Sequence, residues 1–150
     1  MKSRCYAGLI LMFSVVLGAS SVAAHCEIPC GIYDDELRIK LMAEHVTTME
    51  KSMKQIVTLS QQQPMNHNQL ARWVNNKEDH AKALQEIVTQ YFMTQRIKFD
   101  AKDYAQKITV LHKMLVYAMK CKQTTDLNHI EALRSLLKDF SQLYFKASSK

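Results

Sequence analysis

Apolar side chains recur every three to four residues through four successive stretches of this 150-residue chain, and this spacing most constrains its fold. It places the apolar side chains of each stretch on one face of a helix. The chain has only three glycines and two prolines, too few for the closely spaced turns of a sandwich or barrel of short strands. The sequence therefore predicts an all-α protein.

The first two helices have recognisable ends. The first is expected to begin after Asp35 and to end in the polar run at residues 61–64, because its proline disfavours helical geometry in the residue before it. The second is expected to begin near Asn66 or Asn68 and to end near Met93. The short link between them predicts an antiparallel pair.

The second half of the chain repeats this organisation. The third helix is expected to open at Asp100, which can cap its free backbone amides, and the fourth at Thr125 or Asp126. The expected inward stripe of the third helix is Tyr104, Ile108, Leu111, Leu115 and Met119. That of the fourth is Ile130, Leu133, Leu136 or Leu137, Phe140, and Leu143 or Tyr144. Residues 34–150 are thus predicted to form an up-and-down antiparallel four-helix bundle.

Residues 1–24 have the pattern of a cleaved secretory signal peptide: Lys2 and Arg4, then an apolar segment, then small residues ending at Ala24. The apolar segment is shorter than the roughly 20 residues that span a bilayer, and no second one follows, so no stable membrane anchor is expected. Cleavage would leave His25 as the first residue. We therefore expect an exported protein, periplasmic or extracellular, with an organelle as the other destination.

Residues 25–33 form a candidate metal-binding hook ahead of the bundle. After cleavage they would offer the amine and imidazole of His25, the amide and thiolate of Cys26 and the thiolate of Cys30. Two thiolates, an amine and an amide nitrogen suit the planar coordination of Ni(II) or Cu(II) better than tetrahedral Zn(II). Because the terminal amine and the next amide close one chelate ring, metal binding would have to follow cleavage.

Two other interpretations of these cysteines stay open. Cys26 and Cys30 could form a disulfide, as paired cysteines of exported chains usually do. Zinc is disfavoured, because two cysteines and one histidine give three side-chain ligands and no second pair is evident. The predicted cut directly before His25 favours the metal, since a disulfide does not require it.

The remaining sequence features predict packing rather than chemistry. The basic residues behind the net charge of +6 are spread along the chain, so no nucleic-acid partner is expected. Cys121 is expected to be a buried thiol. Five histidines show no ligand spacing and are assigned no metal: His45, His67, His80, His112 and His129. Helically spaced methionines could bind copper but fit core packing better: Met42, Met49, Met53, Met114 and Met119.

The hook sequence HCEIPCGIY at residues 25–33 resembles the metal hook of nickel-containing superoxide dismutases, H-C-x-x-P-C-G-x-Y at the mature amino terminus, with every fixed position present. The resemblance implies a four-helix bundle assembled as a homohexamer, with one nickel ion per subunit. It further implies conversion of superoxide to dioxygen and hydrogen peroxide by cycling between Ni(III) and Ni(II). The alternative is an exported module that sequesters nickel or copper without turnover.

The resemblance also assigns site residues. His25 would supply its terminal nitrogen and an axial imidazole, Cys26 its amide nitrogen and thiolate, and Cys30 the second thiolate. Tyr33 would stand beside the open face of the metal and help position superoxide. A second catalytic tyrosine near the end of helix two is matched by Tyr91.

The sequence departs from the family in the residues that steady the axial imidazole. The family typically uses a carboxylate on the first helix and an arginine on the second. Glu44 is a candidate for the carboxylate, and His80 stands in the region where the arginine is expected. Glu27 occupies a position where aspartate is common.

Overall fold

The computed structural model describes residues 31–146, which are helical and contain no strand. Its helices are α2 (Asp35–Ser60), α3 (His67–Glu86), the π-helix η1 (Ile87–Arg96), α4 (Tyr104–Gln123) and α5 (Asn128–Lys146). Since η1 continues α3 directly, the described residues form four helical rods, and the predicted all-α fold is confirmed. None of the helices within this range combines the length and apolar character needed to cross a bilayer.

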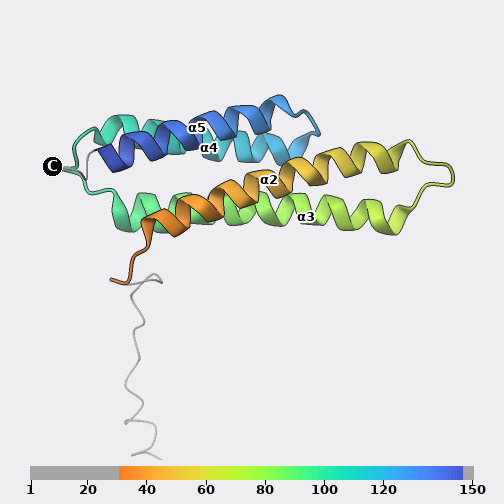
Figure 1. The fold of residues 1–150 in the computed structure, drawn as a ribbon, viewed down its shortest axis with the longest axis horizontal. Coiled ribbons are helices and arrows are strands. Elements are labelled where there is room, and N and C mark those ends of the chain that lie inside the picture. The colour runs from red at the N-terminus through yellow and green to blue at the C-terminus, as the bar shows by residue number, and fades with distance from the viewer. Residues whose placement is uncertain (1–30, 147–150) are drawn as a thin grey trace, which may run out of the picture.

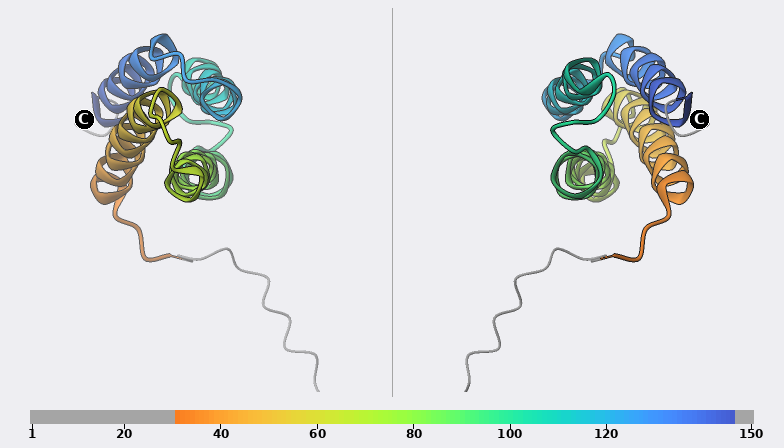
Figure 2. Two further views of the ribbon diagram at one scale, coloured as in Figure 1. Left: turned by 90° about the vertical axis from the view of Figure 1, so that its right-hand side faces the viewer. Right: turned by 90° about the vertical axis from the view of Figure 1, so that its left-hand side faces the viewer.

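Successive rods run in opposite directions, as the predicted up-and-down bundle requires (Figure 1). Viewed end on, the rods surround one core (Figure 2). Both α2 and α4 pack against α3 and against α5, so α2 and α4 lie diagonally across the bundle. The α2–α3 hairpin extends beyond the α4–α5 hairpin at one end. At the opposite end, the start of α2 lies near η1 and the end of α5. This is the end at which residues 31–34 enter the bundle.

Side-chain caps fix where three of the helices begin. Asp34 accepts a hydrogen bond from the Leu37 amide at 2.9 Å, and Asn66 accepts one from the Gln69 amide at 3.1 Å. Asp126 accepts from the amide of Asn128, the first residue of α5, at 3.0 Å. Each bond satisfies a backbone donor that the helix itself leaves unpaired. The predicted starts at Asn66 and Asp126 are therefore confirmed.

The core is formed by aromatic side chains, methionines and branched aliphatic side chains. Phe92 and Phe140 are fully buried and meet edge to face, with ring centroids 4.9 Å apart. The fully buried methionines are Met42, Met49, Met53 and Met114, which confirms packing rather than a copper-binding array. Cys121 is also fully buried, and desolvation raises the pKa of its thiol to about 11. The prediction of a buried thiol is confirmed.

Two predicted helix ends are wrong. The second rod continues past Met93 to Arg96, because its last ten residues adopt π-helical hydrogen bonding. The third begins at Tyr104 rather than Asp100, because the preceding residues form turns and the Lys107 amide pairs with the Asp103 carbonyl. Backbone pairing in the turn thus outweighs the capping preference of Asp100.

One predicted core residue, Met119, is also wrong, since 43% of its surface is exposed. The expected stripe advanced from Leu111 to Met119 in two steps of four residues. Each such step turns an α-helix about 40° beyond a full rotation, so the stripe drifts off the inner face. The observed stripe keeps Leu111 and continues through Met114, Ala118 and Cys121.

Candidate functional site at the amino-terminal end of the bundle

The predicted tyrosine pair lies at the end where the chain enters the bundle. Tyr33 precedes α2 and Tyr91 lies in η1, yet their ring centroids are 5.8 Å apart and their planes meet at 79°. Tyr91 is buried, whereas 38% of Tyr33 is exposed. The proposed metal ligands His25, Cys26 and Cys30 lie outside the described residues. The structure therefore brings together the two predicted residues that it describes.

Asp35, the first residue of α2, is the polar centre of this site. Its Oδ1 accepts hydrogen bonds from the Tyr91 hydroxyl at 2.6 Å and from Arg96 Nε at 2.8 Å. Its Oδ2 accepts from Arg96 Nη2 at 2.8 Å and from the Tyr144 hydroxyl at 2.9 Å. The guanidinium is thus bound in bidentate fashion, the strongest arrangement of this ion pair. One carboxylate joins α2, η1 and α5.

These contacts shift the pKa values of the groups involved. Burial acts to raise the pKa of Asp35, but the hydrogen bonds from Arg96, Tyr91 and Tyr144 outweigh it and hold that pKa below its usual value. Burial, followed by the hydrogen bond to Asp35, raises the pKa of Tyr91 well above its usual value. The same two causes raise the pKa of Tyr144 to about 12. At neutral pH the carboxylate is therefore charged and both phenols keep their protons.

Two guanidinium groups lie against the tyrosine pair. The Cζ atom of Arg96 is 4.2 Å from the centroid of the Tyr33 ring, and that of Arg38 is 5.0 Å from the centroid of the Tyr91 ring. Both contacts fall within the range of cation–π attraction. Arg96 is paired with Asp35, whereas Arg38 Nε is buried and has no hydrogen-bond partner within residues 31–146. Positive charge thus accompanies both rings.

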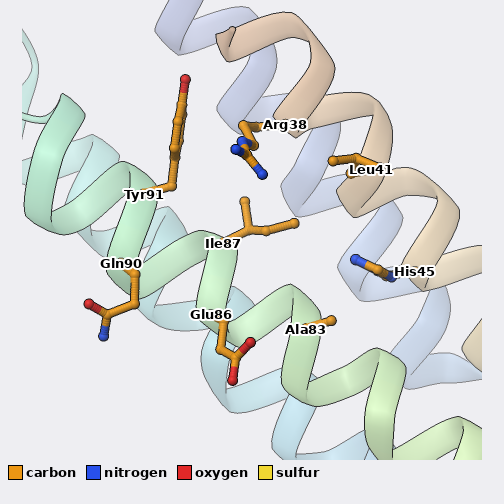
Figure 3. A pocket seen from close by; sticks show the side chains of 8 residues that line it. All are labelled: Arg38, Leu41, His45, Ala83, Glu86, Ile87, Gln90 and Tyr91. Atoms are coloured by element: carbon orange, nitrogen blue, oxygen red, sulfur yellow. The ribbon is translucent and has the colours of Figure 1, made fainter. Parts of the chain in front are cut away.

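A groove of about 490 Å³ runs between α2 and the second rod, starting at Tyr91 (Figure 3). Tyr91 and Arg38 lie at one end of it and His45 at the other. Its lining residues are Arg38, Leu41, His45, Ala83, Glu86, Ile87, Gln90 and Tyr91. Arg38 and the buried Tyr91 therefore line the same end of the groove.

The residues suggested for steadying the axial imidazole lie elsewhere. Glu44 is exposed, nine residues along α2 from Asp35 or about 13 Å of helix. His80 pairs with His45 across the α2–α3 contact, with the two Nδ1 atoms 2.9 Å apart. Desolvation and the neighbouring His80 lower the pKa of His45. The carboxylate–guanidinium pair at the entry end is Asp35 with Arg96. Because His25 lies outside the described residues, the roles suggested for Glu44 and His80 stay predictions.

Sequence reasoning missed Asp35, Arg96 and Tyr144 as site residues. Asp35 was treated only as a helix boundary, and Arg96 lies beyond the expected end of the second helix. Tyr144 was one of two choices for a core position of the fourth helix. The signal that could have found them is positional: in an up-and-down bundle, the start of the first helix meets the ends of the second and fourth.

The described part of the chain offers no competing metal site, because residues 31–146 contain no cluster of three or more histidine, cysteine, aspartate or glutamate side chains that could hold an ion.

Comparison with known proteins gives one match. A family model described as nickel-containing superoxide dismutase matches residues 20–148, which is most of the chain. No curated protein and no solved structure matches this chain.

Proposed function

The chain belongs to the nickel-containing superoxide dismutase family, and from this premise we propose that it disproportionates superoxide with one nickel ion held at its processed amino terminus. The observation that carries the proposal is the family match over residues 20–148, which includes the whole hook sequence as well as the bundle. An oxidoreductase activity dependent on nickel follows from membership. The position of the metal is our inference.

The hook donors fit nickel on chemical grounds. His25 would hold the ion through its terminal amine and imidazole, Cys26 through its amide nitrogen and thiolate, and Cys30 through its thiolate. Anionic sulfur and amide donors favour tetragonal Ni(II) over tetrahedral zinc and stabilise a higher oxidation state. When bound, nickel would supply one-electron chemistry between Ni(III) and Ni(II), so that two superoxide anions and two protons give dioxygen and hydrogen peroxide.

The bundle restricts where the hook can lie. Tyr33 follows Cys30 by three residues, so their Cα atoms are at most about 11 Å apart. Because Tyr33 packs on Arg96 and against Tyr91, this reach keeps the last hook donor near the tyrosine pair. Tyr33 is partly exposed and would line the approach of superoxide, while the buried Tyr91 would form the wall behind it.

The same end of the bundle suits an anionic substrate. Arg38 has no ion-pair partner within residues 31–146, so its charge is not cancelled locally by a carboxylate. A cation near the site raises the local concentration of an anion and so the rate of encounter. We therefore assign Arg38 the role of attracting superoxide toward the tyrosine pair.

Export and assembly complete the proposal. Residues 1–24 would be removed during export to the periplasm or extracellular space, and the mature chains would assemble as a homohexamer. Ile32 and Phe99 support assembly, since 83% and 92% of their surfaces are exposed in the single chain. Large apolar side chains exposed to this degree favour burial against another subunit.

The test is expression of the chain with its leader, followed by mass spectrometry, nickel analysis, light scattering and superoxide turnover. We expect a mature chain beginning at His25, one nickel ion per subunit, a hexamer, and turnover that nickel removal abolishes. Nickel bound without turnover would instead support the sequestering module. A stoichiometric Cys26–Cys30 disulfide in active material, or full activity with the leader attached, would refute the site.

Cys30→Ser provides the matched test of the ligand set, with Cys121→Ser as its control. Both substitutions replace a thiol with a hydroxyl, but Cys121 is buried in the core and far in sequence from the hook. We expect Cys30→Ser to lose nickel and turnover, and Cys121→Ser to keep both. Equal activity of the two variants would exclude Cys30 as a ligand.

A further inference from the structure

The four hydrogen bonds at Asp35 come from three side chains that are all far from Asp35 in the sequence. Tyr91 and Arg96 lie 56 and 61 residues away, and Tyr144 lies 109 residues away. The carboxylate is partly buried, with 17% of its side chain exposed, so these donors replace much of its hydration. An arrangement that satisfies one carboxylate on α2 with donors from two other helices, η1 and α5, fixes the orientation of each donor.

The π-helical register of η1 lets two of these donors come from one helix. Residues five apart point about 140° away from each other on an α-helix, so Tyr91 and Arg96 could not both face α2 there. Bonds from residue i to i−5 bring such residues into line. The backbone of Ile87–Arg96 is π-helical, and Ile97 N donates to Phe92 O, five residues back. The side chains of Thr94 and Gln95 also donate to carbonyls five residues back, those of Thr89 and Gln90.

Asp35 fixes the positions of both tyrosines of the site, Tyr91 and Tyr33. It binds Tyr91 directly, through the phenol hydroxyl. It acts on Tyr33 through Arg96, whose guanidinium lies 4.2 Å from the ring centroid of Tyr33 while bound at two points by the carboxylate. Removing the carboxylate would release both rings.

The hydrogen bond to Asp35 also decides what Tyr91 can contribute. A phenol that donates its one proton to a carboxylate has no second proton to offer a substrate. Transfer of that proton to superoxide would leave a phenolate 2.6 Å from a carboxylate, an arrangement that like-charge repulsion disfavours. The protons consumed in the reaction must therefore come from another donor, such as solvent reaching the exposed Tyr33.

We propose that Asp35 and Arg96 are positioning residues for superoxide disproportionation, and that they hold Tyr91 as a fixed, proton-retaining wall and Tyr33 as the oriented approach to the hook. This inference rests on the proposed function. It assigns Asp35, Arg96 and Tyr91 roles that do not include contact with the metal or donation of a proton.

The experiment compares Asp35→Asn with Asp34→Asn. Both remove one negative charge at the start of α2, but Asp34 is exposed and acts only on the Leu37 amide, a role that asparagine also fills. In Asp35→Asn, the amide NH₂ group must face an N–H of Arg96, which cannot accept a hydrogen bond. The network breaks while the side-chain shape is kept.

Two readouts follow on these variants. In nickel-free protein, ultraviolet titration of the phenols should show the high-pH ionisation of Tyr91 and Tyr144 moving to lower pH in Asp35→Asn but not in Asp34→Asn. In nickel-loaded protein, Asp35→Asn should lower kcat at least about tenfold with unchanged nickel content, because the rings are misplaced. Tyr91→Phe should keep the pH profile of the wild type, since its proton is not used.

A replacement variant and three contrary results complete the test of these roles. If Asp35→Asn fails to fold, as judged by circular dichroism, Arg96→Gln takes its place, because it frees Tyr33 and leaves both phenol bonds to Asp35. Indistinguishable titrations and kcat values for Asp35→Asn and Asp34→Asn would overturn the positioning role. A changed pH profile in Tyr91→Phe would overturn the proton-retaining role. If wild type shows no nickel-dependent turnover, the proposed function fails, while the titration still decides whether Asp35 holds the phenols.

Discussion

Lys77 offers a test of how the bundle holds its second and third rods, α3 and α4, together. It is a buried lysine of α3, with 4% of its surface exposed, and its Nζ donates to the carbonyl of Cys121 at 2.8 Å and to that of Lys122. Both carbonyls lie in the last turn of α4, where the helix leaves its acceptors unpaired. Lys77→Met keeps the length of the side chain and removes the charge.

The expected cost follows from opposing terms. Two hydrogen bonds to a charged donor contribute about 3–6 kcal/mol together. Methionine recovers part of this, because an ammonium no longer has to be desolvated, but it leaves both carbonyls without their donor. We expect a net loss of about 2 kcal/mol in the free energy of unfolding, equivalent to roughly 6–8 °C in Tm for a domain of this size.

Urea unfolding at one fixed protein concentration measures this cost, because assembly would make the midpoint depend on concentration. The control is Lys82→Met on the same helix: Lys82 is 68% exposed, and its ion pair with Glu86 spans 3.9 Å. Such a surface pair contributes less than about 0.5 kcal/mol. If Lys77→Met and Lys82→Met lose the same stability, the carbonyls of α4 do not depend on the Lys77 ammonium.

The remaining predictions concern charge at the entry end. Because the pKa of Asp35 lies below its unfolded value of 3.8, its ionised form stabilises the fold fully above that value and progressively less as pH falls through the folded pKa. The stability difference between wild type and Asp35→Asn should therefore shrink below about pH 4 in urea titrations, and a difference independent of pH would contradict this. For Arg38→Gln, loss of one positive charge beside the tyrosine pair should lower kcat/KM about twofold at low ionic strength and weaken its salt dependence. An unchanged salt dependence would remove Arg38 from the attraction of superoxide.

Much of the fold follows from local sequence patterns. The sequence predicts helix starts near Asn66 or Asn68 and at Thr125 or Asp126, and the structure shows Asn66 and Asp126 capping amides within three residues. The buried stripe of α5 was predicted because Ile130, Leu133 and Phe140 follow helical spacing closely. Caps and apolar stripes depend on residues within a few positions of one another, so they can be predicted from the sequence alone.

The errors arise where tertiary contacts decide the local backbone. No residue in the stretch of η1 marks a change to π-helical pairing, so the sequence could not extend the second helix to Arg96. Asp35 and Tyr144 meet only after the bundle closes, and neither belongs to a short motif. The hook is predicted from nine contiguous residues, whereas the hydrogen bonds of Asp35 join three helices.

The bond between Tyr144 and Asp35 has a consequence for biosynthesis. Tyr144 lies two residues before the end of α5, so Asp35, at the start of α2, gains this partner only after α5 has been synthesised. A product cut short before α5 would carry every residue of the hook and yet lack the aromatic donor that closes the site. Synthesis of α5 is therefore needed to assemble the site, and copies that end before α5 lack the Tyr144 bond.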